Sequence, residues 1–113
     1  MTDIVKIVFF CQEQDIATWQ KISELLSQGK SGMMLQDFLD KLAPDAGDLL
    51  DDLFEEVDPS ELYAEYTEQN ENQFMFVLMA GSDGDFVASE FRKLFKALPV
   101  TNTRVAVGCD DAM

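Results

Sequence analysis

Paired carboxylates are the residues of this chain best placed to do chemistry. Asp51-Asp52 and Glu55-Glu56 stand four residues apart, so on a helix they would lie on one side. Two carboxylates held close together can serve as a general acid and a general base. Acidic residues at this density are also typical of the solvated outer side of an amphipathic helix. The pattern leaves acid–base catalysis as an alternative and favours an exposed acidic surface.

A glycine-rich stretch, Gly81–Asp85, is the second candidate site. It joins an apolar run to a helical pattern, a junction at which backbone N–H groups can bind phosphate. Asp83 and Asp85 would repel an anion there, although the same two carboxylates could hold Mg²⁺ or Ca²⁺. The full calcium-loop pattern is missing. A turn with a helix cap from Ser82 or Asp83 is therefore the favoured interpretation, and no metal site is predicted.

Other catalytic machinery is missing from the sequence. The chain has no histidine, which is the most frequent general base near neutral pH and the commonest metal ligand. Cys11 and Cys109 are too far apart in the sequence for a C-x-x-C motif. Neither a phosphate-binding P-loop nor a G-x-S-x-G nucleophile elbow occurs. The sequence therefore predicts a protein that is not an enzyme and that has no cofactor.

The negative charge is concentrated in one part of the chain. The net charge is −14, and the segment between Leu42 and Phe91 holds 14 of the 22 acidic residues and none of the 8 basic ones. Acidity that only aids solubility does not require this segregation. A field of one sign attracts a basic partner and speeds its association. Nucleic acid and an anionic membrane are poor partners for such a surface.

Two apolar runs predict the centre of a sheet. Ile4–Cys11 and Gln73–Ala80 are almost uninterrupted in apolar residues, which is typical of strands buried on both faces, with Phe76 among the most buried residues. Leu62–Glu68 predicts an acidic, exposed edge strand, and Arg104–Cys109 predicts the last strand. Apolar residues at helical spacing predict four helices, over Ile16–Gln28, Met33–Leu42, Ala46–Val57 and Asp85–Leu98.

The order of these elements predicts an α+β fold. A ferredoxin-like βαββαβ antiparallel sheet with strand order 4-1-3-2 places the two most apolar strands in its centre. The acidic helical hairpin at Met33–Val57 would be an insertion before the edge strand. We expect a single domain over residues 1–113. Without a membrane span or an export signal, we expect it in the cytoplasm, with Cys11 and Cys109 as free thiols at opposite ends of the sheet.

These features favour a non-catalytic acidic binding protein that engages a basic partner protein, as nuclease inhibitors, immunity proteins and DNA mimics do. The third helix and the edge hairpin would supply the binding face. The candidate residues are Asp48, Asp51, Asp52, Glu55, Glu56, Glu65 and Glu68. The alternative is a small regulatory or ligand-sensing ferredoxin-like domain that dimerises through its sheet or a helix. A divalent-metal-dependent enzyme that uses the acidic cluster is a third possibility.

Overall fold

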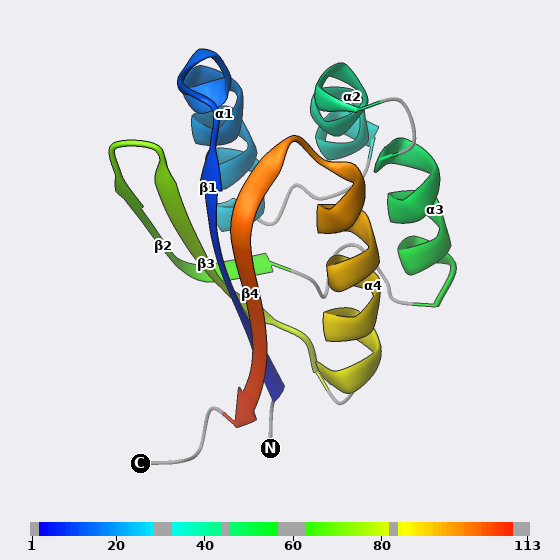
Figure 1. Ribbon diagram of the computed structural model, residues 1–113. Helices are drawn as coiled ribbons and strands as arrows, with labels where there is room; N and C mark the ends of the chain where they lie inside the picture. Colours follow the sequence, from blue (N-terminus) through cyan, green and yellow to red (C-terminus); the bar gives the residue numbers. More distant parts are fainter. Residues whose placement is uncertain (1–2, 29–32, 44–45, 57–62, 82–83, 110–113) are drawn as a thin grey trace.

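A four-stranded antiparallel sheet forms one layer of the molecule, and the helices lie on one of its sides (Figure 1). The computed structural model describes residues 3–28, 33–43, 46–56, 63–81 and 84–109. The strands are β1 (Asp3–Cys11), β2 (Tyr63–Asn70), β3 (Gln73–Met79) and β4 (Val100–Cys109). They lie in the order β2-β3-β1-β4, which is 4-1-3-2 counted from the opposite edge. The predicted α+β class and antiparallel sheet are confirmed.

The helices lie close to their predicted positions. They are α1 (Ile16–Ser27), α2 (Met33–Leu42), α3 (Ala46–Glu56) and α4 (Gly84–Ala97), with a short 3-10 helix over Glu13–Asp15 before α1. The prediction for β4 was too short, because this strand begins at Val100 rather than Arg104. Asn102 has a φ of 52° and lies where the pairing of β4 with β1 shifts register. Because of this irregularity, the first part of the strand does not continue the side-chain alternation of the second part, and the sequence pattern did not predict it.

Described residues cover the central strands on one face only, and side chains on the other face are partly exposed, so the prediction of burial on both faces was wrong. Alternate side chains of β1 and β3, including Val5, Ile7 and Phe76, point to the helices and are buried. The intervening Val8 and Met75 point the other way and are partly exposed. Side chains alternate across a strand, and both sets are apolar here. An apolar run therefore appears without a second layer of described residues to cover it.

Phe9 is the centre of the core. Its ring centroid lies 4.5 Å from that of Trp19, 5.0 Å from Phe95, 5.5 Å from Phe76 and 5.8 Å from Phe74. Rings at these separations attract one another beyond the gain from burial alone. Trp19 is 1% exposed and belongs to the core. The indole N–H of Trp19 has no hydrogen-bond acceptor within the described ranges.

The hairpin of α2 and α3 completes this core. Leu39 of α2 and Leu50 and Leu53 of α3 are buried. Leu39 and Leu50 also line a small cavity of about 20 Å³, together with side chains from α1, β3 and α4. The hairpin thus closes the space between α1 and α4, and the outer side of α3 is left to the solvent.

The start of α4 is held against the start of β1. The backbone N–H of Gly84 donates to Oδ2 of Asp3, at 3.1 Å. A Cβ on Gly84 would lie 2.6 Å from the Cβ of Asp3, so only glycine permits this close approach. Asp85 is exposed in the first turn of α4. The predicted capping residues Ser82 and Asp83, and the cation-binding alternative at Asp83, lie outside the described residues.

The two cysteines belong to opposite ends of the β1–β4 pair. Cys11 pairs with Val100, whereas Cys109 pairs with Asp3. Eight residues of extended strand separate these positions by about 26 Å, far beyond the ~7 Å between Cα atoms that a disulfide allows. Cys11 is a free, buried thiol. Its pKa is raised by burial and also by the nearby negative charge of Asp15, which makes it a weak nucleophile at neutral pH.

Candidate functional site

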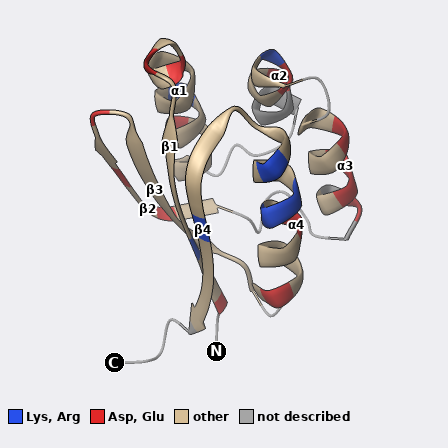
Figure 2. Ribbon diagram, in the orientation of Figure 1, with Lys and Arg blue, Asp and Glu red and all other residues tan. Residues whose placement is uncertain are grey.

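The outer side of α3 carries a stripe of acidic side chains. Asp48, Asp51, Asp52 and Glu55 are all exposed, while Leu50 and Leu53 on the opposite side are 1% exposed. Figure 2 shows these acidic residues on the side of α3 that faces away from α4. The amphipathic pattern that predicted this helix also predicted its orientation, because burial of the leucines leaves the carboxylates in water.

The charges on α3 oppose one another. Residues three and four positions apart on a helix are neighbours, so each of these carboxylates has another beside it. The last turn of α3 contains no basic residue, although a cation is favoured at a helix C-terminus and an acid is not. Within the described part of the chain, none of the four makes an ion pair or a side-chain hydrogen bond. Asp48 lies in the first turn, where an acid is favoured, so the unfavourable charges of the stripe are those of Asp51, Asp52 and Glu55.

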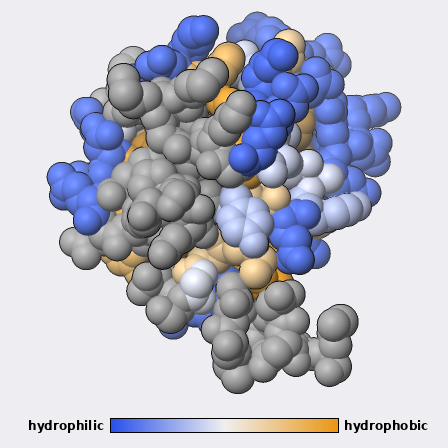
Figure 3. All heavy atoms as spheres, turned by 180° about the vertical axis from the view of Figure 1, so that it is seen from behind, coloured by the Kyte–Doolittle hydropathy of each residue, from blue (hydrophilic) through white to orange (hydrophobic). Residues whose placement is uncertain are grey.

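The acidic residues of β2 lie elsewhere on the molecule. Glu65 and Glu68 are exposed on β2, which is an edge strand and has β3 as its one neighbour among the described strands. Figure 1 places β2 and α3 at opposite sides of the molecule. Seen from behind, hydrophilic side chains gather over α3 on one side and over the β2–β3 hairpin on the other (Figure 3). The structure therefore divides the predicted residues into two surfaces and does not form one face from them.

Glu56 belongs to the helical backbone of α3, but its side chain lies outside the described part of the structure. The described residues contain no group of three or more Asp, Glu or Cys side chains placed to hold a metal ion. On α3 the four described carboxylates are exposed on the outer side of the helix, where a substrate would stay in contact with water. This arrangement suits the recognition of a charged surface better than acid–base catalysis, which works best in a site that excludes water.

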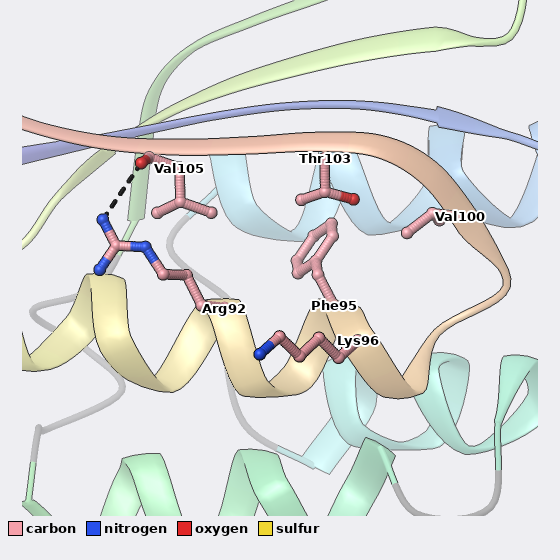
Figure 4. A pocket seen from close by; sticks show the side chains of 6 residues that line it. All are labelled: Arg92, Phe95, Lys96, Val100, Thr103 and Val105. Carbon is pink, nitrogen blue, oxygen red and sulfur yellow. Dashed lines mark hydrogen bonds between the residues drawn. The ribbon is translucent and has the colours of Figure 1, made fainter.

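A pocket between α4 and β4 is a second candidate site, which the sequence did not reveal. It has a volume of about 400 Å³ and is lined by Arg92, Phe95 and Lys96 of α4 and by residues of β4. The β4 residues are Val100, Thr103 and Val105. Figure 4 shows the Phe95 ring between the helix and the strand, with Arg92 and Lys96 on the α4 side of the pocket. This volume is within the range of small-molecule sites.

The polar side chains that line this pocket are the positively charged Arg92 and Lys96 and the neutral Thr103. All three can donate hydrogen bonds. Nη2 of Arg92 donates to the backbone carbonyl of Val105, at 3.2 Å, which leaves its other N–H groups for a ligand. Lys96 has no ion-pair partner among the described residues, and no carboxylate lines the pocket. With Phe95 and two valines as the apolar part of the wall, the arrangement suits an anion that has a small apolar body.

Comparison with known proteins finds no matching family model, no matching curated protein and no matching solved structure. Function therefore has to be argued from the surfaces and the pocket themselves. No helix within the described residues is long and apolar enough to cross a membrane.

Proposed function

We propose that this chain is a non-catalytic binding protein whose α3 presents an acidic surface to a basic partner protein. The observation that supports the proposal is the stripe of Asp48, Asp51, Asp52 and Glu55, which is exposed and has no cation in the last turn of its helix. Packing of α3 uses its inner side, where Ala46, Leu50 and Leu53 are buried. Carboxylates that weaken their own helix and fill no structural need are expected where a partner supplies the missing positive charge.

The proposed partner carries a cluster of Lys and Arg side chains. The field of the acidic segment draws such a protein in, and the stripe on α3 pairs with its cations. Basic clusters of this kind occur on nucleases and other proteins that bind phosphate backbones, so inhibition, immunity or imitation of DNA charge is the expected mode of action. In the same proposal the sheet is ferredoxin-like, as its strand order supports, and the α2–α3 hairpin is an acidic insertion.

Capture of the partner should depend strongly on salt. We expect the immobilised protein to retain a basic protein from a lysate of its native host at 50 mM NaCl and to release most of it at 500 mM. The reason is that the screening length falls from more than 10 Å to a few ångströms over this range. Quantitative mass spectrometry of the eluates measures this. Retention that is unchanged at 500 mM NaCl, or enrichment of acidic proteins, would contradict the proposal.

The pocket at α4 and β4 supports a second candidate function, a small ligand-sensing domain. We expect benzoate to bind there with a Kd on the order of millimolar, as befits a ligand of about nine heavy atoms. Amide shifts in NMR titrations should map to Arg92, Lys96 and Thr103, and Arg92→Gln should abolish them. Lys93→Gln is the matched control, because Lys93 is exposed and does not line the pocket. Equal shifts with neutral benzamide would contradict recognition of the anion.

A further inference from the structure

One face of the sheet is mainly apolar, although the exposed Lys6 of β1 lies on it, and no described element is packed there. Alternation of side chains places Ile4, Val8 and Phe10 of β1 and Met75 and Val77 of β3 on this face. The helices lie on the other face (Figure 1). Tyr63 and Tyr66 of β2 belong to the same face and are 39% and 52% exposed. Central strands of this composition are typical of sheets that are covered on both faces.

The strand register sorts the charges on this face to opposite edges. Glu68 pairs with Met75, Met75 with Val8, and Val8 with Arg104, so these four side chains form one row across the sheet. An acid stands at the β2 end of the row, a base at the β4 end, and apolar residues between them. Within one molecule, three strand spacings of about 4.8 Å keep Glu68 about 14 Å from Arg104, and the two do not form an ion pair.

Side-chain size is sorted in the same way. In the next row, Tyr66 stands at the β2 edge and Ala106 at the β4 edge, and in the row beyond it Tyr63 and Gly108 hold the same two places. In these two rows the β2 edge is therefore bulky, and the β4 edge is small. A Cβ on Gly108 would meet only Ile4, at 3.6 Å, so the surface beside it is open.

We propose that a second copy of this chain covers the sheet face in a symmetric dimer, with the two-fold axis parallel to the strands. This axis places β2 of each copy over β4 of the other and keeps every row opposite itself. Glu68 then meets Arg104 of the second copy, Tyr66 meets Ala106, and Tyr63 meets Gly108. By the same rule Lys6 stands over Val77 of the second copy, one row and one strand from its Glu68. The Glu68 row is self-complementary in charge, and the two tyrosine rows are self-complementary in size.

The spacing of the two sheets suits these contacts. Packed sheets lie about 10 Å apart, a gap that Glu and Arg side chains span together. The crossing of about 30° between packed sheets shifts the ends of a row by about one residue, which long side chains can follow. Four strands of about eight residues cover roughly 500 Å² of flat area. This is smaller than the ~800 Å² per partner of a standard interface, so we expect a dimer of micromolar affinity.

Charge exchange at the two ends of the row tests this dimer. Sedimentation velocity between 5 and 500 µM protein, at 150 mM NaCl, should show a reversible monomer–dimer equilibrium. Glu68→Arg and Arg104→Glu should each weaken the dimer at least about tenfold, because each variant places like charges together at both ends of the interface. An equimolar mixture of the two variants should form a heterodimer of wild-type affinity, since both of its pairs are again opposite in sign.

Restoration in the mixture separates the interface from a defect in folding, because misfolded single variants would not recover on mixing. Glu71→Arg is the matched control, since Glu71 is exposed in the turn after β2, outside the rows of the face, and should leave the affinity unchanged. A wild-type protein that stays monomeric at 500 µM would overturn the proposal. So would single variants that dimerise normally, or a mixture that stays monomeric. The dimer does not depend on the partner proposed for α3, which lies on the other side of the molecule.

Discussion

Phe76→Ala should lower the free energy of unfolding by about 3–5 kcal/mol, the usual range for removing a buried phenylalanine. Phe76 is 1% exposed, and its ring centroid lies 5.5 Å from that of Phe9 and 6.3 Å from that of Trp19. It also lines the small cavity at the meeting point of the four described helices. A truncated side chain would enlarge this cavity, because the sheet and the helices around it cannot close the gap together. Urea titration followed by tryptophan fluorescence measures the change.

Phe10→Ala is the matched control for this prediction. Phe10 lies on β1 but points to the uncovered face and is partly exposed, so the same atoms are removed from a site that water already reaches. At a protein concentration of about 100 nM, well below the micromolar Kd expected for the proposed dimer, we expect a loss of less than half that of Phe76→Ala. A loss below about 1 kcal/mol for Phe76→Ala, or an equal loss for both variants, would show that the buried face of β3 is not the centre of the core.

The sequence was a good guide to the elements and to their inner sides. Apolar runs located β1 and β3, and helical spacing located α3 within one residue, because both depend on which side chains must leave water. Burial on both faces could not be judged in this way. Met75 and Val77 are as apolar as their inward neighbours, and the pattern records only composition, not whether a second layer is present in the same chain.

The two candidate sites differ in how far the sequence could reveal them. The stripe on α3 follows from the local pattern of one helix, so four of its residues were predicted correctly as exposed. The separation of this stripe from Glu65 and Glu68 depends on strand order and on the packing of α3 against α4, which no local pattern contains. The pocket needs Arg92 and Lys96 to face Thr103 across the gap between α4 and β4. The only sign of the pocket in the sequence was the spacing of Arg92 and Lys96, which stand four residues apart and so lie on the same side of a helix.

Reversal of charge on α3 should remove the binding of the basic partner without loss of stability. The variant replaces Asp48, Asp51, Asp52 and Glu55 with Lys. Its melting temperature should stay close to that of the wild type, because four like charges replace four like charges along the helix. The cation gained in the last turn is offset by the cation placed in the first turn, where Asp48 was favourable. All four side chains are exposed and none contributes to the core. Loss of binding with an intact melting transition would therefore report on recognition alone.

The matched control reverses four exposed acids that lie away from α3. These are Glu13, Glu24, Glu65 and Glu71. Both sets change the net charge of −14 by the same amount, so long-range attraction of a basic protein is reduced equally in the two variants. Any difference between them measures the part of the binding energy that depends on where the charges lie. Glu24 forms an exposed ion pair with Lys21, a contact of the kind that contributes little to stability.

The most direct test of the proposed function compares capture of the native basic partner by these two variants at 50 mM NaCl, with the wild type as reference. We predict that the α3 variant captures less than a tenth of the partner that the wild type retains, and that the control variant captures at least half. Equal losses in the two variants would show that net charge alone attracts the partner. Full capture by the α3 variant would contradict the acidic recognition surface outright.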